Sequence, residues 1–233
     1  MTSQVFNQDC ISYMRSLPDK YFHLSIADPP YGAGGVANDG ERFGGRFKQY
    51  NTGSTDMNTW DAAPPEEFFA ELTRVSQHQI IWGANFFNSM PGCKCFLVWV
   101  KTNIPDGFQM AQAEYAWTTL TCNSRVYHGS SARSRDGQHH FHPTEKPAAL
   151  YKWAFEVWLS TLPQPLEAPL RVFDPMMGSQ SSRIAARVLE LDYYGCEIDA
   201  EYYRRGCQRY DEETEGLIAR PHGLAPVRQL TLF

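Results

Sequence analysis

Apolar residues recur along the chain in short runs that are separated by amphipathic or polar stretches. Short runs of this kind are typical of strands that are buried on one or both faces. In the run 22–27, apolar and polar residues alternate, which indicates a strand with one face in the core. The pattern predicts strands at 5–6, 22–27, 80–82, 96–100, 114–120, 124–127, 170–173 and 193–196.

Between these runs, apolar side chains return every three or four residues, which indicates amphipathic helices. After Asp9, a suitable N-cap, the apolar residues Ile11, Met14 and Leu17 share one face. Further helices are predicted after Pro65 and Pro147, and at 181–191 and 200–210. Strands that alternate with helices predict a doubly wound α/β sheet.

Two long segments carry few aliphatic side chains. Segment 32–59 contains seven glycines, and segment 128–142 contains two arginines and four histidines. Loops of such length inside compact domains are usually functional or disordered. We expect a single folded domain at 1–210 that carries both loops, followed by a flexible tail at 211–233 that ends in Gln-Leu-Thr-Leu-Phe.

Charge and cysteine content narrow the functional classes. The chain has 21 Lys and Arg against 26 Asp and Glu, a net charge of −5, so any nucleic-acid site must be a local basic patch. None of the six cysteines forms a CxxC pair, which argues against a metal site and for reduced thiols in a cytoplasmic protein. No apolar stretch approaches a membrane span in length, and residues 1–10 lack the basic start and apolar core that we expect of a signal peptide.

The strand predicted at 170–173 runs into the glycine-bearing turn 174–179 and a helix. A glycine lets a ligand approach the backbone, and free N–H groups at a helix start attract negative charge. The next strand ends at Glu197, where a carboxylate can bind both hydroxyls of a ribose. Because the chain has neither GxGxxG nor GK[ST], the pattern favours a nucleoside without phosphates. An ordinary βαβ turn is the alternative.

The strand at 22–27 ends in Asp28-Pro29-Pro30-Tyr31. Proline lacks an N–H group and cannot continue a sheet, so carboxylate and carbonyl oxygens remain there as hydrogen-bond acceptors. Such a set suits an amino group with two donor hydrogens, and Tyr31 can stack on a flat ring. Alternatively, the segment only terminates the strand and Asp28 caps a helix.

Three motifs together resemble those of the β class of amino-group DNA methyltransferases. Segment 28–31 resembles motif IV, 142–147 motif X and 173–179 motif I, in the circularly permuted order of that class. Segments 80–87 and 96–101 are also similar to those of small phage and prophage adenine methyltransferases. The resemblance covers about residues 3–210. It implies a Rossmann-like S-adenosylmethionine-dependent methyltransferase fold, with a mostly parallel sheet of seven strands, one of them antiparallel.

The resemblance implies S-adenosylmethionine as the cofactor. Its methionine part would meet Asp174, Met176, Gly178 and Ser179, its ribose Glu197, its carboxylate Thr144 and Lys146, and its adenine Asp9 and Cys10. Asp9 serves equally well as a helix cap. The chain departs from the family at Gln180 and Ala84, where glycines are common. A side chain at Gln180 would crowd the turn or donate to the cofactor.

The resemblance also implies an enzyme that transfers a methyl group to the N6 amine of adenine in DNA, directly and in line, after the base is flipped out of the duplex. The catalytic residues would be Asp28, Pro29, Pro30 and Tyr31. Asp28 and the Pro29 carbonyl would each accept one amine N–H. Tyr31 would stack on the base, with Phe43 or Phe47 as a second aromatic.

Contacts to DNA phosphates are expected from basic residues in and near the two long segments, namely Arg42, Arg46, Lys48, Arg125, Arg133 and Arg135. A plain solvated surface is the alternative. Because 233 residues leave no room for a separate recognition domain, a short recognition site or weak specificity follows.

Three alternative functions stay open. Cytosine N4 methylation uses the same chemistry, although the family associates Ser-Pro-Pro with cytosine and Asp-Pro-Pro with adenine. Methylation of RNA or of a protein amide shares the fold, and the protein enzymes tend to have Asn-Pro-Pro-Tyr. A catalytically inactive DNA-binding module is the alternative outside enzymes; Asp28 and Glu197 argue against it, whereas Gln180 leaves it open.

The last five residues form a separate motif. They resemble the peptide by which DNA-processing enzymes bind the bacterial sliding clamp, which implies that Gln229, Leu230, Leu232 and Phe233 form the clamp contact. The alternative is that these apolar residues pack back onto the domain as a final strand. A tethered contact of this kind raises the local concentration of DNA, which suits a chain with a net charge of −5.

Overall fold

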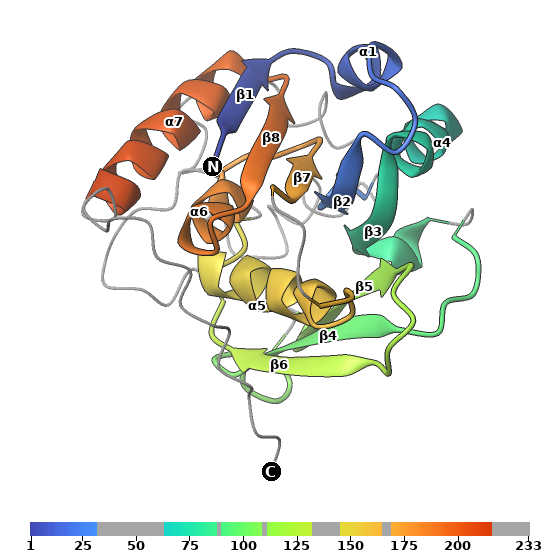
Figure 1. Cartoon of the computed structure of the whole chain (residues 1–233). Helices are drawn as coiled ribbons and strands as arrows, with labels where there is room; N and C mark the ends of the chain where they lie inside the picture. The colour runs from blue at the N-terminus through green and yellow to red at the C-terminus, as the bar shows by residue number, and fades with distance from the viewer. Residues whose placement is uncertain (32–62, 88–89, 109–110, 132–144, 165–168, 216–233) are drawn as a thin grey trace.

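The computed structural model describes residues 1–31, 63–87, 90–108, 111–131, 145–164 and 169–215. Within them, eight strands form one sheet in the order β1-β8-β7-β2-β3-β5-β4-β6 (Figure 1). The strands are β1 Ser3–Asn7, β2 Phe22–Ala27, β3 Ser76–Trp82, β4 Phe96–Lys101, β5 Ala113–Thr118, β6 Arg125–Gly129, β7 Arg171–Asp174 and β8 Asp192–Glu197. Each overlaps one of the predicted runs, so the pattern of apolar residues located the whole sheet.

The sheet is parallel except at β5, which pairs antiparallel with both β3 and β4. One antiparallel strand agrees with the expectation from the resemblance, but the expected number of seven strands is wrong, since the described residues form eight. The sheet is wider because β6, a short strand at its edge, continues the parallel pairing beyond β4.

Helices cover both faces of this sheet, as a doubly wound fold requires. They are α1 Cys10–Arg15, α4 Glu66–Val75, the short 3-10 helix η2 Ala84–Phe86, α5 Ala148–Leu159, α6 Ser181–Val188 and α7 Ala200–Thr214. Figure 1 shows α1 beside α4 on one side of the sheet, and α5, α6 and α7 on the other. α7 continues past residue 210, where we expected the tail to begin, and the side chain of Thr214 is buried.

Two apolar cores result, one on each face. In β3, Ile80 and Trp82 point into the core beneath α5 and α6, whereas Ile81 points into the core beneath α1 and α4. Val172 and Phe173 of β7 divide in the same way. Because successive side chains of a strand point to opposite faces, the central strands are apolar on both sides and form near-continuous apolar runs in the sequence.

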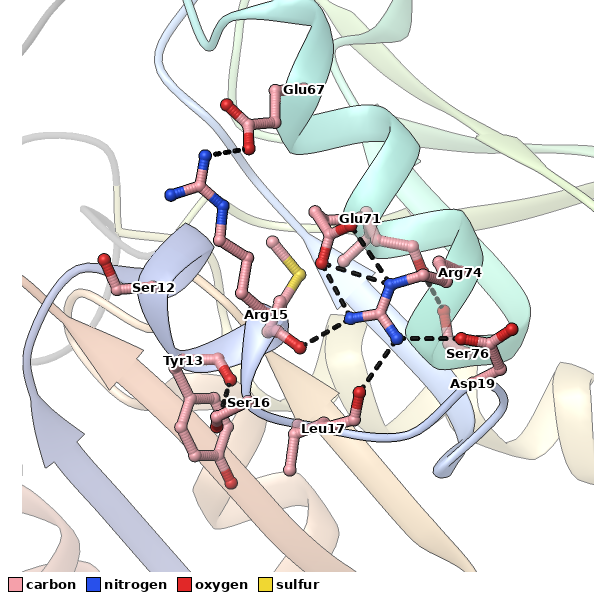
Figure 2. Close-up of polar contacts among 12 residues, drawn as sticks. Ser12, Tyr13, Arg15, Ser16, Leu17, Asp19, Glu67, Glu71, Arg74 and Ser76 are labelled. Carbon is pink, nitrogen blue, oxygen red and sulfur yellow. Dashed lines mark hydrogen bonds and ion pairs between the residues drawn. The ribbon is translucent and has the colours of Figure 1, made fainter.

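An arginine joins α1 to α4 (Figure 2). Arg74 donates to the carbonyl oxygens of Met14 at 2.7 Å and Leu17 at 2.8 Å, and also to the carboxylates of Glu71 and Asp19. The carbonyls at the end of a helix have no partner within the helix, so this contact satisfies part of the end of α1. It also fixes the segment that leads into β2.

No helix among the described residues is long and apolar enough to cross a membrane.

Candidate active site

Four parallel strands end at one edge of the sheet and carry the site. Asp28 follows β2, Asp174 ends β7, Glu197 ends β8 and Gly83 follows β3. These strands are neighbours in the order β8-β7-β2-β3. Open α/β sheets bind ligands outside the carboxyl ends of their strands, so the two predicted motifs, which are far apart in the sequence, meet where a ligand is expected. We call this side of the sheet, formed by the carboxyl ends of β8, β7, β2 and β3, the ligand edge.

Both carboxylate oxygens of Asp28 have partners. Oδ1 accepts a hydrogen bond of 3.0 Å from the Tyr31 hydroxyl, and Oδ2 accepts one from the Lys146 ammonium group. Burial raises the pKa of Asp28, and the positive charge of Lys146 opposes that rise. Each carboxylate oxygen has a second lone pair, so Asp28 can still accept hydrogen bonds from a ligand.

Lys146 lies between two carboxylates, which is not the position we expected from the resemblance. Its ammonium group contacts Asp28 and lies 3.2 Å from Glu114 Oε2, instead of being free to meet a cofactor carboxylate. Burial opposes the charge of Lys146, but both carboxylates favour it and raise the pKa of Lys146 well above its usual value. Glu114 also pairs with Lys101 at the end of β4.

Tyr31 is held by its ring as well as by its hydroxyl. The ring stacks on Phe86 of η2, with 4.6 Å between centroids and 14° between planes. Gly83 has a φ of 65°, and a Cβ there would lie 2.0 Å from a ring carbon of Tyr31. The glycine requirement in this segment is therefore at Gly83. Ala84, the departure noted in the sequence, is buried without such a contact.

The turn after β7 is closed by Glu197. Its two carboxylate oxygens accept hydrogen bonds of 2.9 Å from the backbone N–H groups of Gly178 and Asp199. Gly178 has a φ of 45°, a conformation that favours glycine. Glu197 is 9% exposed, and burial raises the pKa of its carboxyl. The next residue, Ile198, has an exposed apolar side chain that sequence reasoning did not single out.

Asp174 is buried within the same turn. It accepts hydrogen bonds from the Met176 backbone N–H at 3.1 Å and from the Ser182 hydroxyl at 2.5 Å. Burial outweighs these bonds and raises the pKa of Asp174 to about 7. The carbonyl of Ser179 accepts a bond of 3.1 Å from Arg209 of α7, which fixes the turn from outside.

Gln180 neither crowds the turn nor points to the cofactor side, in contrast to our expectation. Its backbone adopts the left-handed conformation, with a φ of 61°, which explains why glycine is common there. Its side chain is fully buried against α7 and donates to the Tyr203 carbonyl at 3.3 Å. Arg183 donates to its other end at 2.8 Å. These bonds compensate for a backbone conformation that costs on the order of 1 kcal/mol.

Asp9 and Cys10 lie at the start of α1, next to the end of β8. Asp9 accepts from the Ser12 backbone N–H at 2.8 Å, so the helix-cap interpretation is confirmed. Cys10 is buried, and burial raises the pKa of its thiol to about 12, which keeps the thiol neutral. Asn7 of β1 pairs in register with Glu197, the ribose candidate. Asp9 and Cys10, which follow Asn7 closely in the chain, therefore lie near Glu197.

Arg125 is not brought to this edge. It begins β6, which runs parallel to β4, and it therefore lies at the opposite end of the sheet from the ends of β2, β7 and β8. Several candidates lie outside the described residues, namely Arg42, Phe43, Arg46, Phe47, Lys48, Arg133, Arg135, Thr144, Gln229, Leu230, Leu232 and Phe233.

Sequence reasoning missed Glu114, Lys101 and Phe86. Glu114 lies on a strand without a motif, and Lys101 ends the segment 96–101, whose resemblance assigns this lysine no role. Only the pairing of β4 with β5 brings the two residues together. Phe86 belongs to a segment that resembles adenine methyltransferases, but nothing in its spacing indicates a contact with Tyr31. Among the described residues, no group of three or more His, Cys, Asp or Glu side chains is placed to hold a metal ion.

Comparison with solved structures gives relatives of this fold. M1.HpyAVI in complex with S-adenosylmethionine matches with a TM-score of 0.50 and 20% identity, over 89% of this chain and 100% of that one. TTHA0409 from Thermus thermophilus, described as a DNA modification methylase and also complexed with S-adenosyl-L-methionine, has a TM-score of 0.55 and 15% identity, over 92% and 96%. The cytosine-N4-specific PvuII DNA methyltransferase has a TM-score of 0.57 and 12% identity, over 92% of both chains.

At these identities the comparison shows the fold, which is that of S-adenosylmethionine-dependent methyltransferases. No protein-family model matches the chain, and no curated protein matches it in sequence.

Proposed function

We propose that this chain is an S-adenosylmethionine-dependent DNA methyltransferase that modifies the N6 amine of adenine. The observation that carries the proposal is the position of the acceptor set 28–31. It lies beside the turn 174–179 and Glu197, at one edge of a sheet that M1.HpyAVI and TTHA0409 share. A group that accepts an amine therefore lies next to a set of residues suited to a nucleoside.

The chemistry of the edge fits S-adenosylmethionine. Three carboxylates, Asp28, Asp174 and Glu197, end neighbouring strands there, and the turn 174–179 contains no cationic side chain. A turn without a cationic side chain is poorly suited to phosphates, which agrees with a cofactor that carries none. Glu197 keeps free lone pairs for two ribose hydroxyls, and the exposed Ile198 beside it offers an apolar surface for a base.

When bound, the cofactor supplies a methyl group on a positively charged sulfur. The chain's own residues bind and orient the target amine. Asp28 accepts one amine N–H and the Pro29 carbonyl accepts the other, which directs the nitrogen lone pair toward the methyl group. The nitrogen gains a bond to carbon as the carbon–sulfur bond breaks, and one amine proton is lost. Asp28 is the base within reach of that proton.

The flipped base needs an aromatic surface. Tyr31 is held in place by Asp28, Gly83 and Phe86, and Phe86 itself is 49% exposed. Phe86 covers one face of the Tyr31 ring, so the stacked pair presents Phe86 to a ligand. Phe43 and Phe47 remain candidates for a second aromatic contact.

Asp28 favours adenine over cytosine as the target. The family associates this carboxylate with adenine, whereas PvuII, whose fold is similar, is cytosine-N4-specific, so the fold alone does not separate the two bases. The test is to incubate unmethylated plasmid DNA with the full chain and S-adenosylmethionine, and to identify the product nucleosides by mass spectrometry. Formation of N6-methyladenine supports the proposal. Formation of N4-methylcytosine would show that cytosine, not adenine, is the target base. If no methylated nucleoside forms, the proposed function is contradicted.

DNA contacts are assigned to Arg42, Arg46, Lys48, Arg133 and Arg135. The support is their position in the sequence, since the two segments that carry them directly follow Tyr31 and precede Lys146. Replacing them by glutamine is expected to weaken DNA binding and to reduce its dependence on salt. Arg125→Gln is the control, because that residue lies at the other end of the sheet.

The tail is proposed to bind a bacterial sliding clamp through Gln229, Leu230, Leu232 and Phe233. The support is the motif alone. A short extended peptide of this kind binds with micromolar affinity, about −8 kcal/mol. A labelled 225–233 peptide titrated with purified clamp tests the proposal by fluorescence anisotropy, with the Leu232→Ala, Phe233→Ala peptide as control. No binding at tens of micromolar, on the order of the expected affinity, would exclude the contact.

A further inference from the structure

Four charged side chains form a continuous row from the sheet into the site. Lys101 Nζ lies 2.5 Å from Glu114 Oε1, Lys146 Nζ lies 3.2 Å from Glu114 Oε2, and Lys146 also contacts Asp28. They come from β4, β5, the segment before α5 and the end of β2. The charges alternate in sign and sum to zero.

The row is shielded from water. The exposed fractions of the side chains are 8% for Lys101, 23% for Glu114, 5% for Lys146 and 12% for Asp28. The two ammonium groups also lie over Trp99 and Trp82, at 5.1 and 5.9 Å from the ring centroids. Buried charges cost free energy unless they are paired, so each member of the row depends on its neighbours.

Glu114 is the member that contacts both lysines. Burial raises the pKa of its carboxyl, but the two lysines outweigh burial and lower that pKa to about 2. Glu114 is therefore an anion at neutral pH. Asp28 differs, because burial raises its pKa and because it lies directly after β2, at the ligand edge.

We propose that Glu114 is a positioning residue for Asp28, which acts by taking up part of the positive charge of Lys146. This inference rests on the proposed function. If Lys146 paired with Asp28 alone, it would neutralise the carboxylate that must attract the amine as that amine becomes positive. Because Glu114 shares Lys146, Asp28 keeps negative charge for the amine while Lys146 still fixes its orientation.

The pH profile of kcat separates this role from a purely structural one. Asp28 must be ionised to act, so the acid limb of kcat reports its ionisation in the complex. The groups that face Asp28 are Lys146, Tyr31, Glu114, Tyr151 and Asp174. Asp174 also titrates, but it is identical in all the variants compared. A shift of the acid limb between variants therefore reports a change in the row of charges that ends at Asp28.

Glu114→Gln removes a negative neighbour and leaves Lys146 to pair with Asp28 alone. We expect kcat to fall by roughly ten- to a hundredfold, as for other misplaced catalytic groups. The KM for S-adenosylmethionine should change little. The acid limb should move to lower pH, because the pKa of Asp28 falls when a nearby negative charge is lost.

Two further variants test the sign of the effect. Glu114→Asp keeps the charge and is expected to return the acid limb to the wild-type position. Lys101→Gln leaves Lys146 as the remaining ion-pair partner of Glu114 among the described residues, which draws Lys146 away from Asp28. The acid limb should then move to higher pH, opposite to the shift of Glu114→Gln.

Glu71→Gln is the matched control. The Glu71 carboxylate is 18% exposed and is bound to Arg74 (Figure 2). Glu71 lies near the end of α4, which leads into the start of β3, whereas the ligand edge lies beyond the end of β3. Its loss should reduce stability without moving the acid limb or kcat.

The inference is overturned if Glu114→Gln retains wild-type kcat and acid limb, or if Glu114→Asp behaves like Glu114→Gln. If Glu114→Gln does not fold, Glu114→Asp and Lys101→Gln decide, and an unchanged acid limb in Lys101→Gln contradicts the inference. A wild-type chain that methylates no DNA contradicts the proposed function instead.

Discussion

Glu197 accepts a 2.9 Å hydrogen bond from the backbone N–H of Gly178, which joins the end of β8 to the turn after β7. A second bond of the same length, from the N–H of Asp199, fixes the other carboxylate oxygen. The carboxylate therefore has one orientation before any ligand binds. Such preorganisation reduces the free-energy cost of binding.

Glu197→Gln should weaken the binding of S-adenosylmethionine. The amide presents one acceptor where the carboxylate presents two, so a hydroxyl of the bound ribose loses its partner at a cost of about 1–3 kcal/mol. Isothermal titration calorimetry measures the change in Kd. Glu156→Gln, which removes a surface carboxylate paired with Lys152 on α5, is the control. A Kd equal to that of the wild type would remove Glu197 from the cofactor site.

Gly83→Ala should displace Tyr31. The new Cβ would lie 2.0 Å from the Tyr31 ring, and the φ of 65° disfavours alanine as well. Gly107→Ala is the matched control, because Gly107 has a φ of 76° with no atom within 4 Å of the added Cβ.

Both variants carry the backbone strain, and only Gly83→Ala adds the clash. Chemical denaturation should find Gly83→Ala less stable than Gly107→Ala by roughly 1–3 kcal/mol, and methyl transfer should fall in Gly83→Ala alone. Equal stability and equal activity of the two variants would show that Tyr31 is not held by this contact.

Asp174 should make stability depend on pH. Its pKa is raised from 3.8 in the free side chain to about 7 in the folded protein, so the folded state retains a proton that the unfolded state has lost. Stability from this group is fully present below about pH 4 and is lost as pH rises to about 7. Asp174→Asn lacks this titration.

The free energy of unfolding of Asp174→Asn minus that of the wild type should therefore become more positive from about pH 4 to pH 7, and should then stay constant. Denaturation at a series of pH values measures this difference and cancels the contributions of the other carboxyl groups. A difference that is independent of pH would show that Asp174 has an ordinary pKa.

The sheet was predictable from the sequence because its strands are apolar runs. The first and last residues of these strands were harder to predict. β3 begins at Ser76, before the predicted start at 80, and the intervening polar residues hid it. Gln79 is buried there because its side chain donates to the Ser76 carbonyl at 2.8 Å. A polar residue that is satisfied by its own strand does not appear in a pattern of apolar positions.

The site was predictable where a motif carries it, as at Asp28 and Glu197, and not where only tertiary structure assembles it. Lys146 belongs to a motif, but its partner Glu114 becomes visible only when β5 pairs antiparallel with β4. The conformation of Gln180 was also hidden, since its side chain is held by Arg183 and α7. Spacing along the chain reports periodicity within an element and says little about contacts between elements.

The most direct test of Asp28 as the amine acceptor is the single-turnover rate of methyl transfer from S-adenosylmethionine to adenine in duplex DNA, compared between the wild type and Asp28→Asn. The wild type should form N6-methyladenine. The variant should be slower by on the order of a hundredfold or more, with cofactor affinity changed by only a few fold, on the order of 1 kcal/mol. A variant that transfers the methyl group at nearly the wild-type rate would contradict the assignment of Asp28 to the target amine.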